Sequence, residues 1–181
     1  LGMCPSGLDC TTIDAMLRRA DIAMYSAKHQ GRNRFTWFDS SMERELMHRN
    51  SLESAMRTGI PNGEFEPYFE QLVDISNGRL TGFEMLARWN HPTRGLIAPD
   101  VFIPIAEETG LIVELSMSLL HRAFEEARNW DHSLILAVNI SPVQLRDPWF
   151  AQKLVKLLVE TGMQPNRLEI EITETSLYDN M

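Results

Sequence analysis

The feature that most constrains the fold is an ordered series of strand-like and helical runs after residue 60. Runs at 65–73 and 79–88 read as strands, and the Asn77-Gly78 pair between them is a strong hairpin signal. Further strand-like runs at 134–139 and 168–172 alternate with helical runs at 100–108, 114–130 and 149–161. This order predicts an α/β fold with a mostly parallel sheet. A (β/α)8 barrel is one natural closure, of which the chain would supply about the first half.

Three polar side chains, Glu84, Asn139 and Glu171, stand in strand-like runs that otherwise read as buried. Strands of a parallel sheet are covered on both faces. Burying a lone carboxylate there costs free energy unless a cation or hydrogen-bond donors bind it. Two Glu and one Asn offer only hard oxygen ligands, which suit Mg²⁺, Mn²⁺ or Ca²⁺ better than zinc. The carboxyl ends of barrel strands lie together, so the pattern predicts an oxygen-lined metal site. Two alternatives stay open: an ion pair of Arg88 with Glu84 or Glu70, and an Asx turn at Asn139.

The residues before this series predict two further helices. Thr11 or Thr12 can cap a helix with an apolar face from Ile13 to Ala27, with Gly31 after it and a short strand at 35–38. Ser40 and Glu43 have capping-box spacing, which predicts a second helix to about residue 57. Its thin apolar stripe suits a connecting helix. One helix and one strand cannot form a core alone, so we expect the chain to open inside a domain.

Composition and charge limit the class of protein. The chain has 181 residues, 44% of them hydrophobic, which allows one domain or slightly more. A net charge of −8 argues against a general binder of nucleic acid polymers. Residues 1–38 carry five Lys/Arg and three Asp/Glu (+2), while the remainder carries twelve and twenty-two (−10), which indicates two modules. We expect free thiols at Cys4 and Cys10, as in a reducing cytoplasm. No apolar run reaches the roughly 18–20 residues that cross a bilayer, and Leu1 starts no signal peptide, so we expect no membrane contact in this segment.

Several motifs carry a resemblance to a known family. The run Glu84-Met-Leu-Ala-Arg-Trp-Asn-His-Pro92, followed by 95–99 and 102–110, resembles the signature region of EAL-domain cyclic-di-GMP phosphodiesterases. Residues 138–145 and 169–174 are similar to two further family motifs, in the right order. Upstream, residues 17–34 resemble the closing helix and strand of a GGDEF (diguanylate cyclase-type) domain. The resemblance implies a GGDEF remnant at 1–38, a linker helix at 39–59 and the N-terminal part of an EAL domain at 60–181.

The resemblance also implies an activity and roles for residues. The activity would be hydrolysis of cyclic di-GMP to linear pGpG with Mg²⁺ or Mn²⁺, in a cytoplasmic part of a bacterial signalling protein whose upstream segments could anchor it in a membrane. Carried over by position, the metal ligands would be Glu84, Asn139 and Glu171. The substrate contacts would be Arg88 (to a phosphate), Leu86 and Glu70. The catalytic set would be Glu84, Glu171 and Glu174, of which Glu174 would steady a loop that brings in the ligands of a second metal.

Two departures from the family pattern matter. Phe69-Glu70-Gln71 stands where the family usually has Tyr-Gln-Pro, so Glu70 would accept from guanine N–H groups or change specificity. The family's paired aspartates, catalytic lysine and a late glutamate come after the position of Met181, so we expect the chain alone to be inert. Two other function classes stay open. One is a receptor that binds cyclic di-GMP without cleaving it, and the other is a structural regulator that forms a homodimer through the helix at 40–57. The intact metal set favours the enzyme.

Overall fold

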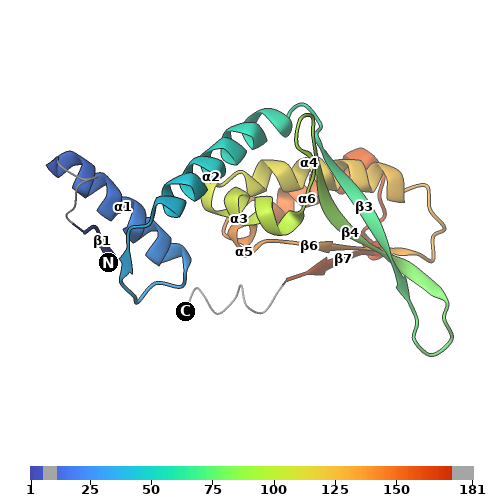
Figure 1. The fold of residues 1–181 in the computed structure, drawn as a ribbon. Helices are drawn as coiled ribbons and strands as arrows, with labels where there is room; N and C mark the ends of the chain where they lie inside the picture. Colours follow the sequence, from blue (N-terminus) through green and yellow to red (C-terminus); the bar gives the residue numbers. More distant parts are fainter. Residues whose placement is uncertain (6–11, 173–181) are drawn as a thin grey trace. The chain divides into compact units, whose positions relative to one another are not determined.

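The computed structural model describes residues 1–5 and 12–172 and falls into two compact units, 1–52 and 53–181 (Figure 1). The first unit contains helix α1 (Ile13–His29), the strands β1 (Gly2–Met3) and β2 (Thr36–Trp37), and most of helix α2 (Ser40–Gly59). β1 and β2 pair in parallel. The division lies inside α2, the helix expected to connect two domains.

Helix α1 begins as the sequence predicts. The Thr12 side chain accepts a hydrogen bond from the Ala15 amide at 3.2 Å, so Thr12 is the cap of the two candidates. Strand β1 was not predicted, because a strand of two residues shows no periodicity. A side chain at Gly2 would overlap the backbone of α1 at Ala20 and Met24, so glycine permits β1 to lie directly against the helix.

Helix α2 begins differently from the prediction. The carboxylate of Asp39, not the Ser40 hydroxyl, accepts from the amide of Ser41 at 2.8 Å. Hydrogen bonds from Ser41 lower the pKa of Asp39, as expected for a carboxylate that caps a helix. Glu43, predicted to complete a capping box, instead accepts from Arg18 at 2.6 Å. The capping-box prediction was therefore wrong: an aspartate one residue earlier offers the amides a charged acceptor.

The second unit is built on a five-stranded sheet. Its strands are β3 (Phe65–Val73), β4 (Leu80–His91), β5 (Gly95–Ile97), β6 (Ile135–Asn139) and β7 (Leu168–Glu171). The order is β3-β4-β6-β7, with β5 also paired to β4. β4 pairs antiparallel with β3 and β5, while β6 pairs in parallel with β4 and β7. The described sheet is thus evenly mixed, not mostly parallel as predicted, since β5 returns along β4 as a second hairpin.

The predicted Asn-Gly hairpin joins β3 to β4. Gly78 has a positive φ of 69° and donates its amide to the Asp74 carbonyl at 2.7 Å. The Asp74 carboxylate also accepts from the amide and hydroxyl of Ser76, at 2.8 and 2.6 Å. These bonds lower the pKa of Asp74. The turn therefore fixes the register of the two strands that carry much of the site.

Helices lie against one face of this sheet. They are α3 (Pro99–Thr109), α4 (Ile112–Ala127), the short α5 (Pro142–Leu145) and α6 (Phe150–Thr161), followed by the 3-10 turn η1 (Pro165–Arg167). Phe102 of α3 packs against Phe65 and Trp89 of the sheet, with ring centroids 5.3 and 5.9 Å away. These three rings are almost fully buried and form the centre of the core. α4 ends before Trp130, whose ring packs instead on Phe69.

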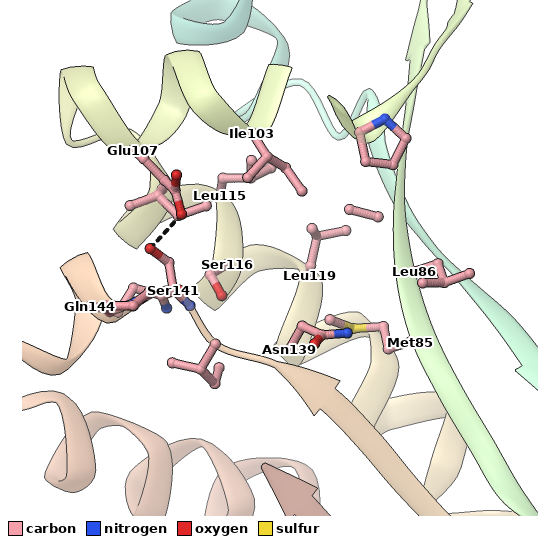
Figure 2. A pocket seen from close by; sticks show the side chains of 15 residues that line it. Met85, Leu86, Ile103, Glu107, Leu115, Ser116, Leu119, Asn139, Ser141 and Gln144 are labelled. Atoms are coloured by element: carbon pink, nitrogen blue, oxygen red, sulfur yellow. Dashed lines mark hydrogen bonds between the residues drawn. The ribbon is translucent and has the colours of Figure 1, made fainter. Parts of the chain in front are cut away.

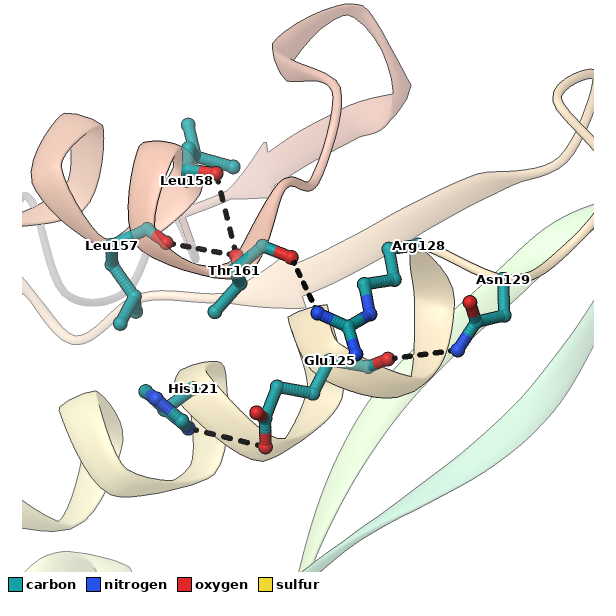
Figure 3. Close-up of polar contacts among 7 residues, drawn as sticks. All are labelled: His121, Glu125, Arg128, Asn129, Leu157, Leu158 and Thr161. Carbon is teal, nitrogen blue, oxygen red and sulfur yellow. Dashed lines mark hydrogen bonds and ion pairs between the residues drawn. The ribbon is translucent and has the colours of Figure 1, made fainter.

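Two arginines hold the ends of the helices. Arg128, next to the end of α4, donates to the Thr161 carbonyl at the end of α6 at 3.2 Å (Figure 3). Arg167 is 2% exposed and donates to the carbonyls of Leu134 and Ala127, each at 2.9 Å. Carbonyls in the last turn of a helix lack partners within it, so these guanidinium groups supply donors to Thr161 and Ala127, and Arg167 also binds the connection before β6 through Leu134. None of the helices in the described ranges combines the length and apolarity needed to cross a bilayer.

Candidate functional site

The candidate site lies on the sheet face opposite the buried aromatic rings. Side chains alternate along a strand, and residues paired across neighbouring strands share a face. The pairing places on this face the residues that we call the polar face: Tyr68, Glu70, Glu84, Leu86, Arg88, Asn139, Glu169 and Glu171. Tyr68 is 46% exposed, and Glu70, Asn139 and Glu171 are also exposed. The expectation that the strands are buried on both faces was wrong for these four residues, whereas Glu84, Leu86 and Arg88 are half-buried.

Glu84 and Asn139 lie together. The Asn139 Nδ2 donates to Glu84 Oε1 at 2.7 Å. Asn139 is the last residue of β6, as predicted. Glu84 lies well inside β4, yet the ladder between β4 and β6 ends one residue later, at Met85 and Val138. Glu84 is therefore at the carboxyl end of the parallel part of the sheet.

Glu171 lies on the other side of Asn139. It is the last residue of β7 and pairs directly with Asn139. Its carbonyl accepts the Ile140 amide at 2.9 Å, which continues the ladder one step past Asn139. Neighbouring strands are about 4.8 Å apart, so the three predicted ligands occupy adjacent places along one edge. Glu174 lies outside the described residues.

The chemistry of this set fits a hard divalent cation. Two ligands at 2.0–2.1 Å and a right angle around Mg²⁺ stand about 2.9 Å apart. The Glu84 and Asn139 atoms, 2.7 Å apart, are close to that spacing. Rotation of the Asn139 side-chain amide by a half-turn would place its oxygen beside Glu84 Oε1. Two oxygens this close repel each other unless a cation lies between them. Within 1–5 and 12–172 no three His, Cys, Asp or Glu converge, so the set depends on the amide of Asn139.

Arg88 shares the polar face but forms no ion pair with a carboxylate of the described chain: Glu66, its direct partner across β3 and β4, accepts instead from Asn90 and Arg122. Its Nη1 donates to the Ala87 carbonyl at 2.9 Å, and its Cζ lies 5.7 Å from the centroid of the Tyr68 ring. A guanidinium over an aromatic face is held by a cation–π interaction. The alternative of an ion pair between Arg88 and Glu84 or Glu70 was therefore wrong. The charge of Arg88 remains available to an anion.

Glu70 pairs directly with Glu84 across β3 and β4, on the polar face. Like charges directly opposite in an antiparallel pair are destabilising. We predict that Glu70→Gln, in the presence of a chelator, stabilises the protein by roughly 0.2–1 kcal/mol. Urea denaturation at low salt measures this, and the gain should shrink at high salt because exposed charges are screened. A loss of stability, or a gain equal to that of Glu126→Gln on the exposed side of α4, would show that Glu70 and Glu84 do not repel.

Several residues next to the site were not singled out from the sequence. Tyr68 and Glu169 share the polar face with Glu70 and Glu171, and the period of two along each strand could have indicated them. Leu86, predicted as a substrate contact, pairs with Tyr68 and is half-buried. Glu107 of α3 accepts from the Ser141 hydroxyl at 2.7 Å, a contact across 34 positions that no local pattern indicates.

Comparisons with known proteins identify a matching family and several relatives. A family model described as EAL domain matches residues 50–181. An uncharacterized signaling protein of Caulobacter vibrioides is 41% identical over 170 residues, which is 94% of this chain and 21% of that protein. MucR of Pseudomonas aeruginosa, a bifunctional diguanylate cyclase/cyclic di-GMP phosphodiesterase, is 34% identical over 172 residues, which is 93% of this chain and 25% of that protein. The chain thus spans about a fifth to a quarter of the length of these relatives.

Solved structures show a similar fold. The MucR phosphodiesterase in complex with c-di-GMP matches with a TM-score of 0.67 and 30% identity, over 72% of this chain and 54% of that chain. The EAL enzyme Bd1971 in its cAMP- and cyclic-di-GMP-bound form matches with a TM-score of 0.69 over 94% of this chain and 46% of that chain. At 22% identity, the second match bears on the fold alone.

Proposed function

Because the chain belongs to the EAL domain family, we propose that the protein that contains it hydrolyses cyclic di-GMP to linear pGpG. The observation that carries the proposal is the contact between Glu84 and Asn139, 2.7 Å apart, with Glu171 adjacent on the same strand edge. The similarity to MucR, a cyclic di-GMP phosphodiesterase by name, supports the choice of substrate.

The proposed roles follow from the polar face. Glu84, Asn139 and Glu171 would hold Mg²⁺ or Mn²⁺ through oxygen atoms. Such a cation, when bound, lowers the pKa of water and neutralises negative charge near phosphorus. Arg88 would bind a phosphate oxygen of the substrate, with its plane set by Tyr68 and the Ala87 carbonyl. Leu86 would contact the substrate from the next place on β4, and Glu70 would accept from guanine N–H groups. Glu174 stays a prediction.

We further propose the domain order 1–38, 39–59 and 60–181, with a GGDEF remnant first, a linker helix next and the N-terminal part of a (β/α)8 EAL barrel last. The MucR alignment covers 93% of the chain and so extends into the residues before Asn50. A cytoplasmic location and a homodimer stay predictions. That the 181 residues alone do not turn over substrate also stays a prediction.

The test is turnover by the full-length protein. Purified protein with Mg²⁺ or Mn²⁺ should convert cyclic di-GMP to pGpG, and a chelator should stop the reaction. Chromatography separates the substrate from the product and measures the conversion. Binding without cleavage under these conditions would favour the receptor instead. If the protein neither binds nor cleaves cyclic di-GMP, the proposed function is refuted.

Arg88→Ala should weaken binding of cyclic di-GMP about ten- to a hundredfold, because it removes charge-assisted hydrogen bonds of about 1.5–3 kcal/mol. Titration calorimetry with Ca²⁺, which accepts the same oxygen ligands, measures binding apart from turnover. Arg79→Ala, at the exposed far end of β4's hairpin, is the matched control and should bind as the wild type does. Unchanged affinity in Arg88→Ala would remove Arg88 from the site.

A further inference from the structure

The segment that follows Asn139 is held by a side chain from a distant helix. Ser141, two positions after Asn139, donates its hydroxyl to Glu107 Oε1 at 2.7 Å (Figure 2). Glu107 belongs to the last turn of α3, which otherwise packs on the other face of the sheet. A hydrogen bond from a hydroxyl to a carboxylate is among the stronger kinds. α3 is thereby tied to the segment that carries Asn139.

Ser141 is fixed through its other groups as well. Its hydroxyl accepts from the Val143 amide at 3.2 Å, and its own amide donates to Gln144 Oε1 at 3.1 Å. This reciprocal arrangement is a capping box that starts α5. Gln144 is 1% exposed, so its amide oxygen cannot exchange readily with water as a partner. Glu107, Ser141, Val143 and Gln144 together form what we call the α3–α5 clamp.

A cavity of about 280 Å³ adjoins the clamp (Figure 2). Asn139, Ser141 and Gln144 line one side of it, Glu107 another, and the rest is mostly aliphatic, including Ile103 and Leu115. Because this space is not filled by packed side chains, van der Waals contact does not fix the segment from that side. The hydrogen bonds of the clamp must do so.

We propose that Glu107 is a positioning residue for Asn139, acting through Ser141; this inference rests on the proposed function. The Ile140 amide is bound to the Glu171 carbonyl at 2.9 Å and its side chain is buried. With Ile140 held by the sheet and Ser141 by Glu107, the Asn139 backbone has little freedom. Its amide then stays beside Glu84, as a preorganised ligand must. Loss of Glu107 releases the segment toward the cavity and weakens cation binding without touching a ligand.

The experiment measures Mn²⁺ binding by the full-length protein, with free Mn²⁺ followed by its paramagnetic resonance signal. We expect Glu107→Ala to weaken Mn²⁺ binding about 10- to 100-fold, the range for residues that orient metal ligands. Glu107→Gln, which can still accept from Ser141, should restore affinity to within roughly fivefold of the wild type. Ser141→Ala should weaken Mn²⁺ binding at least as much as Glu107→Ala, because it also removes the acceptor of the Val143 amide, and the double variant should be no weaker than Ser141→Ala, since both single variants remove the same Glu107–Ser141 bond. Glu108→Ala, an exposed neighbour on α3, is the control and should leave Mn²⁺ binding unchanged.

The KM for cyclic di-GMP should stay near the wild-type value at saturating Mn²⁺, while the Mn²⁺ concentration for half-maximal turnover rises with the weakened binding. Glu107→Ala with wild-type Mn²⁺ affinity but a lower melting temperature would overturn the inference, since Glu107 would then be structural only. If Glu107→Ala does not fold, Ser141→Ala and Glu107→Gln decide by the same criterion. A wild type that binds no Mn²⁺ would refute the proposed metal site itself, and the two failures are thus distinguishable.

Discussion

Glu171→Gln should reduce hydrolysis of cyclic di-GMP by the full-length protein at least about a hundredfold, beyond the usual loss for residues that only orient a metal ligand. The amide keeps the shape of the side chain at the end of β7, next to Asn139, but removes the charge that attracts a cation. Initial rates over a series of Mn²⁺ concentrations measure the effect.

The control for this variant is Glu126→Gln, the same change at an exposed position of α4. It should leave the rate unaltered. If Glu171→Gln turns over at the wild-type rate at an ordinary Mn²⁺ concentration, Glu171 is a structural carboxylate. If it regains activity only at high Mn²⁺, the ligand role stands, because mass action compensates for weakened binding.

Arg167→Met should lower the free energy of unfolding by about 2–4 kcal/mol, since it leaves the Leu134 carbonyl without its donor and removes one of the two bonds to the Ala127 carbonyl, which the Trp130 amide also binds at 3.1 Å. Arg167 is 2% exposed and bonds the carbonyls of Ala127 and Leu134, so one side chain joins the end of α4 to the start of β6. Methionine is of similar length and keeps most of the apolar packing, which confines the change to the hydrogen bonds.

Urea denaturation followed by tryptophan fluorescence measures this loss of stability, and Arg79→Met, at an exposed position, is the matched control. In Arg167→Met, hydrogen exchange of the amides at the end of α4 should accelerate more than exchange in the rest of the chain. A midpoint within error of the control would mean that water replaces the guanidinium at both carbonyls.

The sequence predicted the elements of the second unit well because their signals are local. The Asn77-Gly78 turn, the glycine after α6 and the alternation along β4 each depend on a few neighbouring residues. It did not predict β5, whose three residues carry no periodicity, nor the even mixture of strand directions. Exposure of the polar face was also missed, since burial depends on which helices reach each face.

The candidate ligands were predicted because Glu84, Asn139 and Glu171 interrupt apolar runs. Their proximity needed the register of β4, β6 and β7, which the sequence leaves open. Arg88 shows the same limit. Its closeness to Glu84 along β4 suggested an ion pair, yet the structure turns its guanidinium toward Tyr68. The Glu107 contact links distant positions and could not be predicted from spacing.

The pairing of β6 with its neighbours has a consequence for folding. Side chains alternate with a period of two, so a slip of β6 by one residue would exchange its faces. Asn139 would enter the side occupied by Met85 and Val138, and a buried apolar residue would reach the polar face. Both changes cost free energy, so the register that removes Asn139 from the polar face is less stable than the native register. The residues proposed to act on substrate therefore also help the chain to discriminate its native alignment from the nearest error.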